Sequence, residues 1–310
     1  MTGAIRDVTL RDGLQLAGGR LPLERKVALV RELLELGVEH LEIGSMARPD
    51  LVPATADTLD LVAALEPDEL ERCWVWVATP GHVRRAVDAG VRRLQYCLSV
   101  SDAHNRANVG RDAETSMAAL PEALEVAARV GADVQLCLAT SFTCPFEGPV
   151  DPDAVLDLVR DPRARGCSDV VVCDTLGQAH PGEVASLVGR VREAVEAMPG
   201  EIGVVFHGHD TWGMGVANAL AAVEAGADVV DGALGGLGGC PFAPGASGNT
   251  ATEDLAFALR PGWLEPAVLR RLVELGEGVT AAVDEPDRSR AASGARSRAT
   301  AFPWTFGHAG

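Results

Sequence analysis

The chain lacks the patterns that mark secreted, membrane and zinc-ribbon proteins. Its seven cysteines have none of the short paired spacings of zinc ribbons or disulfide frameworks. No stretch approaches the roughly 18 consecutive apolar residues of a membrane-spanning helix, and the N-terminus shows no signal-peptide pattern. We therefore expect a cytoplasmic protein with reduced thiols and no membrane association.

Basic residues are also scarce. The sequence has 27 Lys+Arg against 44 Asp+Glu, a formal net charge of −17, and such a chain repels polyanions. Nucleic-acid binding is therefore not expected, although a local basic pocket can still hold an anionic ligand. With 47% hydrophobic residues, the 310-residue chain has enough apolar material for one large core.

Short apolar, β-branched runs alternate with segments of helical period, which indicates repeated βα units and a parallel sheet. Eight runs occur, at residues 5–10, 40–45, 74–78, 94–99, 134–139, 169–173, 203–207 and 229–234. The helical segments include residues 23–36, 114–130, 152–159, 183–197, 214–225 and 252–259. Glycines at positions 37, 90, 131, 166 and 226 stand where helices end. Because eight parallel strands can close on themselves, we predict a (β/α)₈ TIM barrel over residues 1–262.

The remaining residues, 263–310, are predicted to form a helical extension and a tail. Residues 265–283 keep a helical period, whereas residues 285–310 turn polar and weakly periodic. A cap, a lid and a disordered tail are all compatible with this pattern. Its aromatic end, with Phe302, Trp304 and Phe306, favours a tail docked on the barrel.

In such barrels the chemistry lies at the carboxyl ends of the strands. His207 and His209 are two residues apart on one predicted strand, so both imidazoles can face one metal ion. Asp12, at the end of another strand, would add a carboxylate, and Asn249 an amide oxygen. Such a set with open positions suits Mg²⁺ or Mn²⁺, with zinc still open. The alternatives are a structural histidine and, for Asn249, a helix N-cap.

Four further residues are candidates for catalysis. Arg11 precedes Asp12 and would project to the opposite side of a continuing strand; the alternative is a surface ion pair. Glu42 and Asp174 are charges in or after apolar runs, where a buried salt bridge competes with a catalytic role. Cys240 follows a glycine-rich loop at residues 235–239, which favours a mobile acid, base or nucleophile.

Together these motifs resemble the 3-hydroxy-3-methylglutaryl-CoA (HMG-CoA) lyase family of divalent-metal TIM-barrel lyases. The similar segments are residues 10–15 (LRDGLQ), 41–45 (LEIGS), 144–148 (CPFEG), 174–177 (DTLG), 207–211 (HGHDT) and 236–254 (GLGGCPFAPGASGNTATED). The last segment is the most specific, because related synthases lack the cysteine-bearing loop. The resemblance implies retro-Claisen cleavage of a 3-hydroxyacyl-CoA to acetyl-CoA and a keto acid, and it suggests a homodimer.

The resemblance also implies roles for individual residues. Mg²⁺ or Mn²⁺ would be held by Asp12, His207, His209 and Asn249. Arg11 would stabilise the thioester enolate and Cys240 would protonate it, while Glu42 and Asp174 would position or relay protons. His207 counts among the catalytic residues as well as the ligands. The expected substrate contacts are Gln15, Ser45, Asn108 and Thr175.

This chain departs from the family pattern near the substrate. The fifth strand has Cys137 where the family usually has tyrosine, and the loop after the fourth strand adds His104. A lyase for another branched 3-hydroxyacyl-CoA, such as citramalyl-CoA, is therefore an alternative. A Claisen-type synthase and a barrel that binds acyl-CoA without turnover are the other two.

Overall fold

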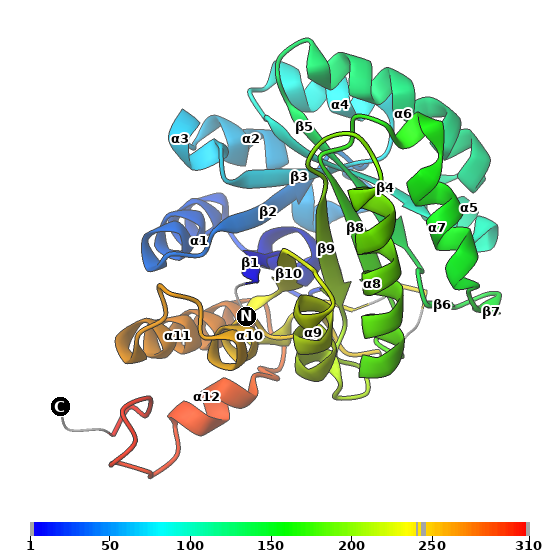
Figure 1. Ribbon diagram of the computed structural model, residues 1–310. Helices are drawn as coiled ribbons and strands as arrows, with labels where there is room; N and C mark the ends of the chain where they lie inside the picture. The colour runs from blue at the N-terminus through cyan, green and yellow to red at the C-terminus, as the bar shows by residue number, and fades with distance from the viewer. Residues whose placement is uncertain (1–2, 240, 243–245, 308–310) are drawn as a thin grey trace.

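The computed structural model describes residues 3–239, 241–242 and 246–307. Eight parallel strands close into a barrel in the order β1-β10-β9-β8-β5-β4-β3-β2, which confirms the predicted (β/α)₈ fold (Figure 1). The barrel strands are β1 (Ala4–Asp7), β2 (His40–Ser45), β3 (Cys73–Val77), β4 (Arg93–Ser99), β5 (Asp133–Ala139), β8 (Asp169–Asp174), β9 (Gly203–Gly208) and β10 (Val229–Gly232). A small antiparallel pair, β6 (Thr143–Cys144) and β7 (Gly148–Pro149), lies in the loop after β5.

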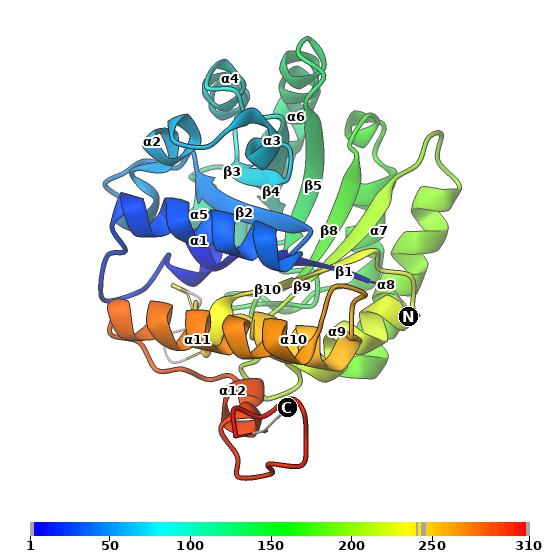
Figure 2. The same ribbon diagram turned by 90° about the vertical axis from the view of Figure 1, so that its left-hand side faces the viewer.

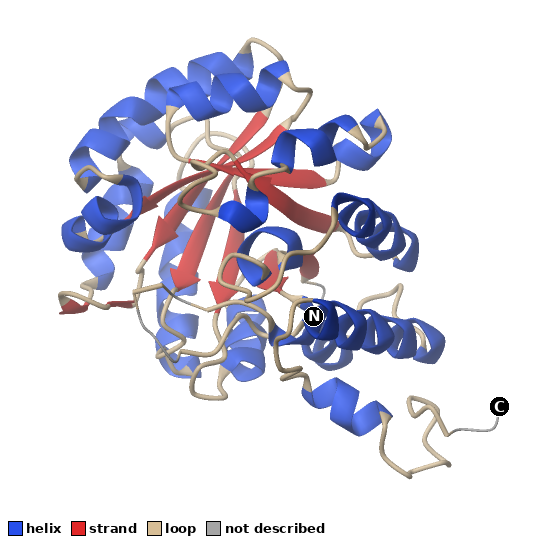
Figure 3. Cartoon of the chain, turned by 180° about the vertical axis from the view of Figure 1, so that it is seen from behind, coloured by secondary structure: helices blue, strands red, loops and turns tan. Residues whose placement is uncertain are grey.

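Helices surround the barrel and connect its strands, as Figures 2 and 3 show from two sides. They are α1 (Leu23–Leu36), α2 (Thr58–Ala63), α3 (Pro67–Leu70), α4 (Pro80–Asp88), α5 (Asp102–Val109), α6 (Ala113–Ala128), α7 (Pro152–Arg160), α8 (Pro181–Glu196), α9 (Gly215–Glu224), α10 (Thr252–Leu259), α11 (Pro266–Ala282) and α12 (Arg290–Ala295). Four single turns complete the set: η1 (Thr9–Gly13), η2 (Pro53–Thr55), η3 (Pro162–Ala164) and η4 (Leu234–Gly236).

The glycines predicted to end helices have the expected left-handed backbone. Gly37 follows α1 with a φ of 102°, and φ is also positive at Gly90, Gly131, Gly166 and Gly226. Gly37 meets a second constraint, because a Cβ atom there would lie 2.7 Å from the Cβ of Trp263. Glycine is therefore needed at this joint both for its backbone angle and for the close approach of the C-terminal extension.

The barrel wall separates two apolar regions. Outward-facing side chains such as Ile5, Leu136 and Val204 belong to the main core between the strands and the helices. Inward-facing side chains form a second cluster inside the barrel, made of Trp76, Ala78, Cys97, Cys137, Ala139, Val171, Cys173 and Val205. Alternate residues of one strand serve the two regions, so the barrel is a packed solid on which a site can be built rigidly.

The first strand is shorter than predicted. β1 ends at Asp7, and Thr9–Gly13 forms a π-helical turn, η1, instead of continuing the strand to residue 10. The expectation that Arg11 and Asp12 project to opposite sides of a strand is therefore wrong. On the turn, both side chains reach the same cavity at the barrel mouth, and they form an ion pair with each other.

The residues beyond the barrel are docked on it. α11 lies alongside α10, and α12 packs against both (Figure 2). Asp254, in the first turn of α10, accepts hydrogen bonds from the Ser289 hydroxyl and from two backbone N–H groups at the start of α12. Trp304 packs edge-on against Phe257 of α10, with the ring centroids 5.9 Å apart. The division of the chain at residue 262 stays a prediction.

The described part of the chain contains six cysteines, all free and buried: Cys73, Cys97, Cys137, Cys144, Cys167 and Cys173. Reduced thiols were expected. Within the same residues, no helix is long and apolar enough to cross a membrane.

Asp7, at the end of β1, is a buried carboxyl group. It accepts hydrogen bonds from the Thr252 hydroxyl at 2.5 Å and from the Thr9 N–H at 3.0 Å. Burial raises the pKa of Asp7 to about 6, from about 3.9 for an ordinary aspartate. The folded state therefore holds this proton more tightly than the unfolded state does. The stability that results is present at low pH and is lost as the pH rises through 6.

Asp7→Asn should remove this pH dependence, because an amide does not ionise and can still bond to both partners. We expect the free energy of unfolding of the variant, relative to that of the wild type, to increase by up to about 3 kcal/mol between pH 4 and pH 7. Urea denaturation at several pH values measures this difference. A difference that stays constant over the range would contradict the prediction.

Candidate metal centre and substrate cavity

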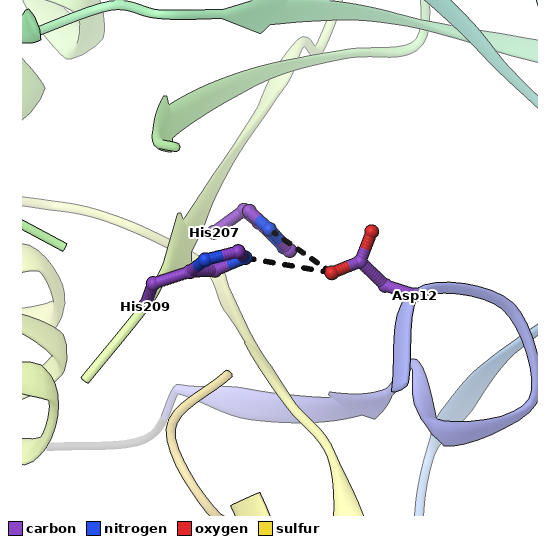
Figure 4. A group of neighbouring side chains, drawn as sticks. All are labelled: Asp12, His207 and His209. Atoms are coloured by element: carbon purple, nitrogen blue, oxygen red, sulfur yellow. Dashed lines mark ion pairs between the residues drawn. The ribbon is translucent and has the colours of Figure 1, made fainter. Parts of the chain in front are cut away.

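Three side chains from distant parts of the sequence converge at the barrel mouth (Figure 4). Asp12 lies on η1 and His207 on β9, and His209 directly follows β9. Asp12 Oδ2 lies 3.4 Å from His209 Nε2 and 4.0 Å from His207 Nε2. One ligand atom from each residue lies within 4.8 Å of the other two. The three can therefore hold one metal ion between them.

Asn249 adds a fourth donor beside these three. Its backbone forms an antiparallel bridge with His209, and its Nδ2 donates to Asp12 Oδ2 at 2.9 Å and to the Leu237 carbonyl at 3.0 Å. Its Oδ1 is buried and has no hydrogen-bond partner among the described residues. Because an unpartnered buried oxygen is unfavourable, a cation at this point would satisfy it. Two imidazoles, a carboxylate and an amide oxygen fit Mg²⁺ or Mn²⁺.

The alternative that Asn249 caps a helix is wrong. α10 begins at Thr252, and its N-cap residue is Ala251. Asn249 lies ahead of this position, on the segment that returns from the glycine-rich loop to the barrel. Its side chain is therefore not engaged with the N–H groups of the helix.

Arg11 stands between two carboxyl groups. Its guanidinium pairs with Asp12, and its Nε lies 3.9 Å from Glu42 Oε2. The guanidinium carbon lies 5.5 Å from the centroid of the Trp76 ring, an arrangement that favours a cation. Glu42 also accepts a hydrogen bond from Gln95 Nε2 at 2.7 Å. The Arg11 side chain is only 16% exposed, so the surface ion pair considered for it is wrong.

Burial and local charge act in opposite directions on the two acids. Burial disfavours the charge of Asp12, but the Arg11 guanidinium and the two histidines outweigh it and hold the pKa of Asp12 well below its usual range. For Glu42, burial outweighs the nearby arginines and raises the pKa. Asp12 is therefore a permanent anion suited to a cation, whereas Glu42 is the carboxyl better able to carry a proton.

These groups line a cavity of about 640 Å³, counted with its opening to solvent. Three of the predicted substrate contacts, Gln15, Asn108 and Thr175, lie on its wall. Ser45 is not among the described residues that line it, and its hydroxyl accepts a hydrogen bond from the Ala47 N–H instead. The cavity therefore brings together most, but not all, of the predicted substrate contacts.

Two predicted catalytic residues are not seen on the cavity wall. Asp174 is buried behind the wall, where it accepts hydrogen bonds from the N–H groups of Gln178 and Ala179 at 3.1 Å each, and burial raises its pKa. It thus fixes the turn after β8. Cys240 lies outside the described residues; its neighbours Gly239 and Pro241 line the cavity.

The cavity also contains residues that the sequence analysis did not single out. Trp76, Gln95, Cys97 and Cys173 lie on its wall, and Asp231 of β10 contacts His207 from behind. All five occupy inward-facing strand positions. The signal available in the sequence was a polar or thiol side chain two residues from another, as in Gln95 and Cys97, within an otherwise apolar run.

An aromatic cluster covers one side of the cavity. Phe242, beyond the glycine-rich loop, packs edge-on against His104 at 5.0 Å and lies 5.7 Å from Phe146, measured between ring centroids. His104 Nδ1 lies 2.7 Å from Ser99 Oγ, and burial lowers the pKa of His104 to about 4. His104 is therefore a neutral wall residue, distinct from the histidines beside Asp12.

Comparison with known proteins finds one family over most of the chain. The HMGL-like family model matches residues 3–278. The hydroxymethylglutaryl-CoA lyase of Pseudomonas mevalonii is 32% identical over 288 residues, which cover 92% of this chain and 94% of that protein. The Bacillus subtilis enzyme of the same name is 30% identical over 287 residues, covering 92% and 95%. The structure of an HMG-CoA lyase from A. baumannii in complex with coenzyme A and 3-methylmalate matches with a TM-score of 0.85, 32% identity and 96% coverage of both chains.

His207→Ala should weaken metal binding, because it removes one of the imidazoles that face Asp12. We expect the dissociation constant for Mn²⁺, measured by calorimetric titration, to rise at least 10-fold. His104→Ala is the matched control, since it removes a buried imidazole from the same cavity but away from Asp12, and it should leave the constant unchanged. An unchanged Mn²⁺ titration for the His207 variant would remove this residue from the ligand set.

Proposed function

Because the chain belongs to the HMGL-like family, we propose that it is a metal-dependent carbon–carbon lyase that cleaves HMG-CoA, or a close analogue, to acetyl-CoA and acetoacetate. The observation that carries this proposal is the cavity in which Arg11 faces the same space as the Asp12, His207 and His209 group. The relative that was solved with coenzyme A and 3-methylmalate supports an acyl-CoA with a small hydroxy acid moiety as the ligand class.

In this proposal, Mg²⁺ or Mn²⁺ is held by Asp12, His207, His209 and Asn249. The unpartnered Oδ1 of Asn249 and the lowered pKa of Asp12 support the assignment. A divalent cation bound there supplies positive charge that lowers the pKa of the substrate's 3-hydroxyl group.

The side chains of the cavity account for the remaining steps. Loss of the 3-hydroxyl proton and cleavage of the adjacent carbon–carbon bond leave a keto acid and a thioester enolate. Arg11, fixed by its neighbours, stabilises the negative charge on the enolate oxygen. Cys240 then gives its proton to the enolate carbon, which completes acetyl-CoA. Glu42, with its raised pKa, positions or relays protons beside Arg11.

The other predicted site residues act on position. Gln15, Asn108 and Thr175 contact the substrate from the cavity wall. Asp174 acts through the turn that it holds, because both of its carboxylate oxygens accept backbone hydrogen bonds and Thr175 is the next residue. This gives Asp174 a supporting role in our proposal.

A second candidate is a related lyase for another branched 3-hydroxyacyl-CoA, such as citramalyl-CoA. One stretch of the cavity wall consists of small side chains, which leave room for a substituent other than methyl: Cys97, Cys137, Ala139 and Cys173. A condensing synthase is less favoured, because a proton donor such as Cys240 serves cleavage.

We further propose that the protein is a cytoplasmic homodimer that does not bind nucleic acid. The net charge of −17 supports the last point, since the global field repels polyanions. The proposed chemistry does not depend on the dimer, because every residue named for it belongs to one chain.

The test is to incubate the purified protein with Mg²⁺ and a panel of 3-hydroxyacyl-CoAs, including HMG-CoA and citramalyl-CoA, and to follow acetyl-CoA release. We expect release from at least one member of the panel and loss of release when EDTA is added, with recovery on adding Mn²⁺ in excess. If no member of the panel yields acetyl-CoA, the lyase proposal is wrong.

Arg11→Met should reduce kcat by about 100-fold to 1,000-fold at saturating Mg²⁺, because it removes the cation that faces the enolate oxygen. KM should change much less, since the interaction is strongest in the transition state. Steady-state kinetics separate the two constants. A variant that loses only KM would assign Arg11 to substrate binding instead.

A further inference from the structure

A buried ion pair lies inside the barrel, beneath the candidate metal centre. Arg6 of β1 donates from Nε and from its second terminal nitrogen to the two oxygens of Asp231 of β10, at 2.8 Å each. Its remaining nitrogen donates to Gln135 Oε1 of β5 at 2.6 Å. All three side chains are almost completely buried. The Asp231 carboxylate is therefore held in one orientation from three strands.

This carboxylate also contacts a candidate ligand. Asp231 Oδ2 lies 3.1 Å from Nδ1 of His207, while Nε2 of the same ring faces Asp12. Because Arg6 outweighs burial, the pKa of Asp231 is lowered, and its oxygens act as acceptors. The hydrogen on the His207 ring is then donated from Nδ1 to Asp231, and the lone pair is left on Nε2.

We propose that Asp231, fixed by Arg6, is a positioning residue that sets the tautomer and the ring orientation of His207 so that Nε2 faces the metal. The inference rests on the metal site of the proposed function and adds two residues to it. Metal-bound histidines commonly donate their second ring N–H to a carboxylate, which raises their strength as ligands. Here that carboxylate is itself held in place by an arginine.

The two histidines differ in this respect. Nδ1 of His209 is buried and has no hydrogen-bond partner among the described residues, whereas Nδ1 of His207 has Asp231. The chain therefore fixes the tautomer of His207 alone. A purely structural ion pair would not need this contact, because replacing a buried pair by apolar side chains of similar volume often leaves stability unchanged.

The first test measures the tautomer in metal-free protein by long-range ¹H–¹⁵N NMR of ¹⁵N-histidine-labelled samples. Wild-type His207 should carry its hydrogen on Nδ1. Asp231→Asn keeps the shape but places an NH₂ donor near the ring, so the hydrogen should shift to Nε2, as in other carboxylate–histidine pairs where this substitution gives the wrong tautomer. Asp7→Asn, another buried acid two strands' width from no ligand contact of its own, is the control and should leave the His207 signals unchanged.

The second test measures Mn²⁺ affinity by calorimetry. We expect the dissociation constant to rise 10-fold to 100-fold in Asp231→Asn, and also in the double variant Arg6→Met/Asp231→Leu, which removes the pair without leaving a buried charge. Thermal unfolding of the double variant should stay close to that of the wild type. The Asp7→Asn control should bind Mn²⁺ as the wild type does.

The proposal is overturned if both variants keep the wild-type tautomer, or if both bind Mn²⁺ within twofold of the wild type while remaining folded. Neither measurement uses turnover. A failure to release acetyl-CoA would therefore refute the proposed activity and leave the positioning role of Asp231 standing on its own measurements.

Discussion

The candidate site depends on the negative charge of Asp12. Arg11 pairs with this carboxylate, Asn249 donates to it, and His207 and His209 turn their Nε2 atoms toward it. A buried carboxylate is unfavourable unless such groups surround it, and here they hold its pKa low. Each of the four is brought by a different feature of the backbone, so the one charge is what gives them a common centre.

The barrel interior is organised in layers beneath this charge. The Arg6 and Asp231 pair lies lowest, and Trp76 with the buried thiols occupies the middle of the lumen. The apolar middle layer lets the polar layers keep separate hydrogen bonds, and only the His207 and Asp231 contact joins them. A rigid lumen of this kind suits a site that must hold several side chains at fixed distances.

Much of the fold followed from the sequence, because period-two and helical patterns alternate cleanly. The π-helical turn η1 did not, since a single irregular turn leaves no period. In the site, His207 and His209 were predictable from their spacing on one strand. The role of Asn249 needed the backbone bridge to His209, which no local pattern encodes. Trp76 and Asp231 were missed because alternation along a strand does not say which set of residues faces the lumen.

β1 is hydrogen-bonded to β10 as well as to β2, so the first strand is completed only by the last. Asp12 follows this first strand, and its partner Asn249 lies 237 residues further along the chain. A folding intermediate without β10 therefore has no metal site at all. A divalent cation would stabilise only the closed barrel and no partial form of it, so the supply of metal acts on finished chains and not on chains still being synthesised.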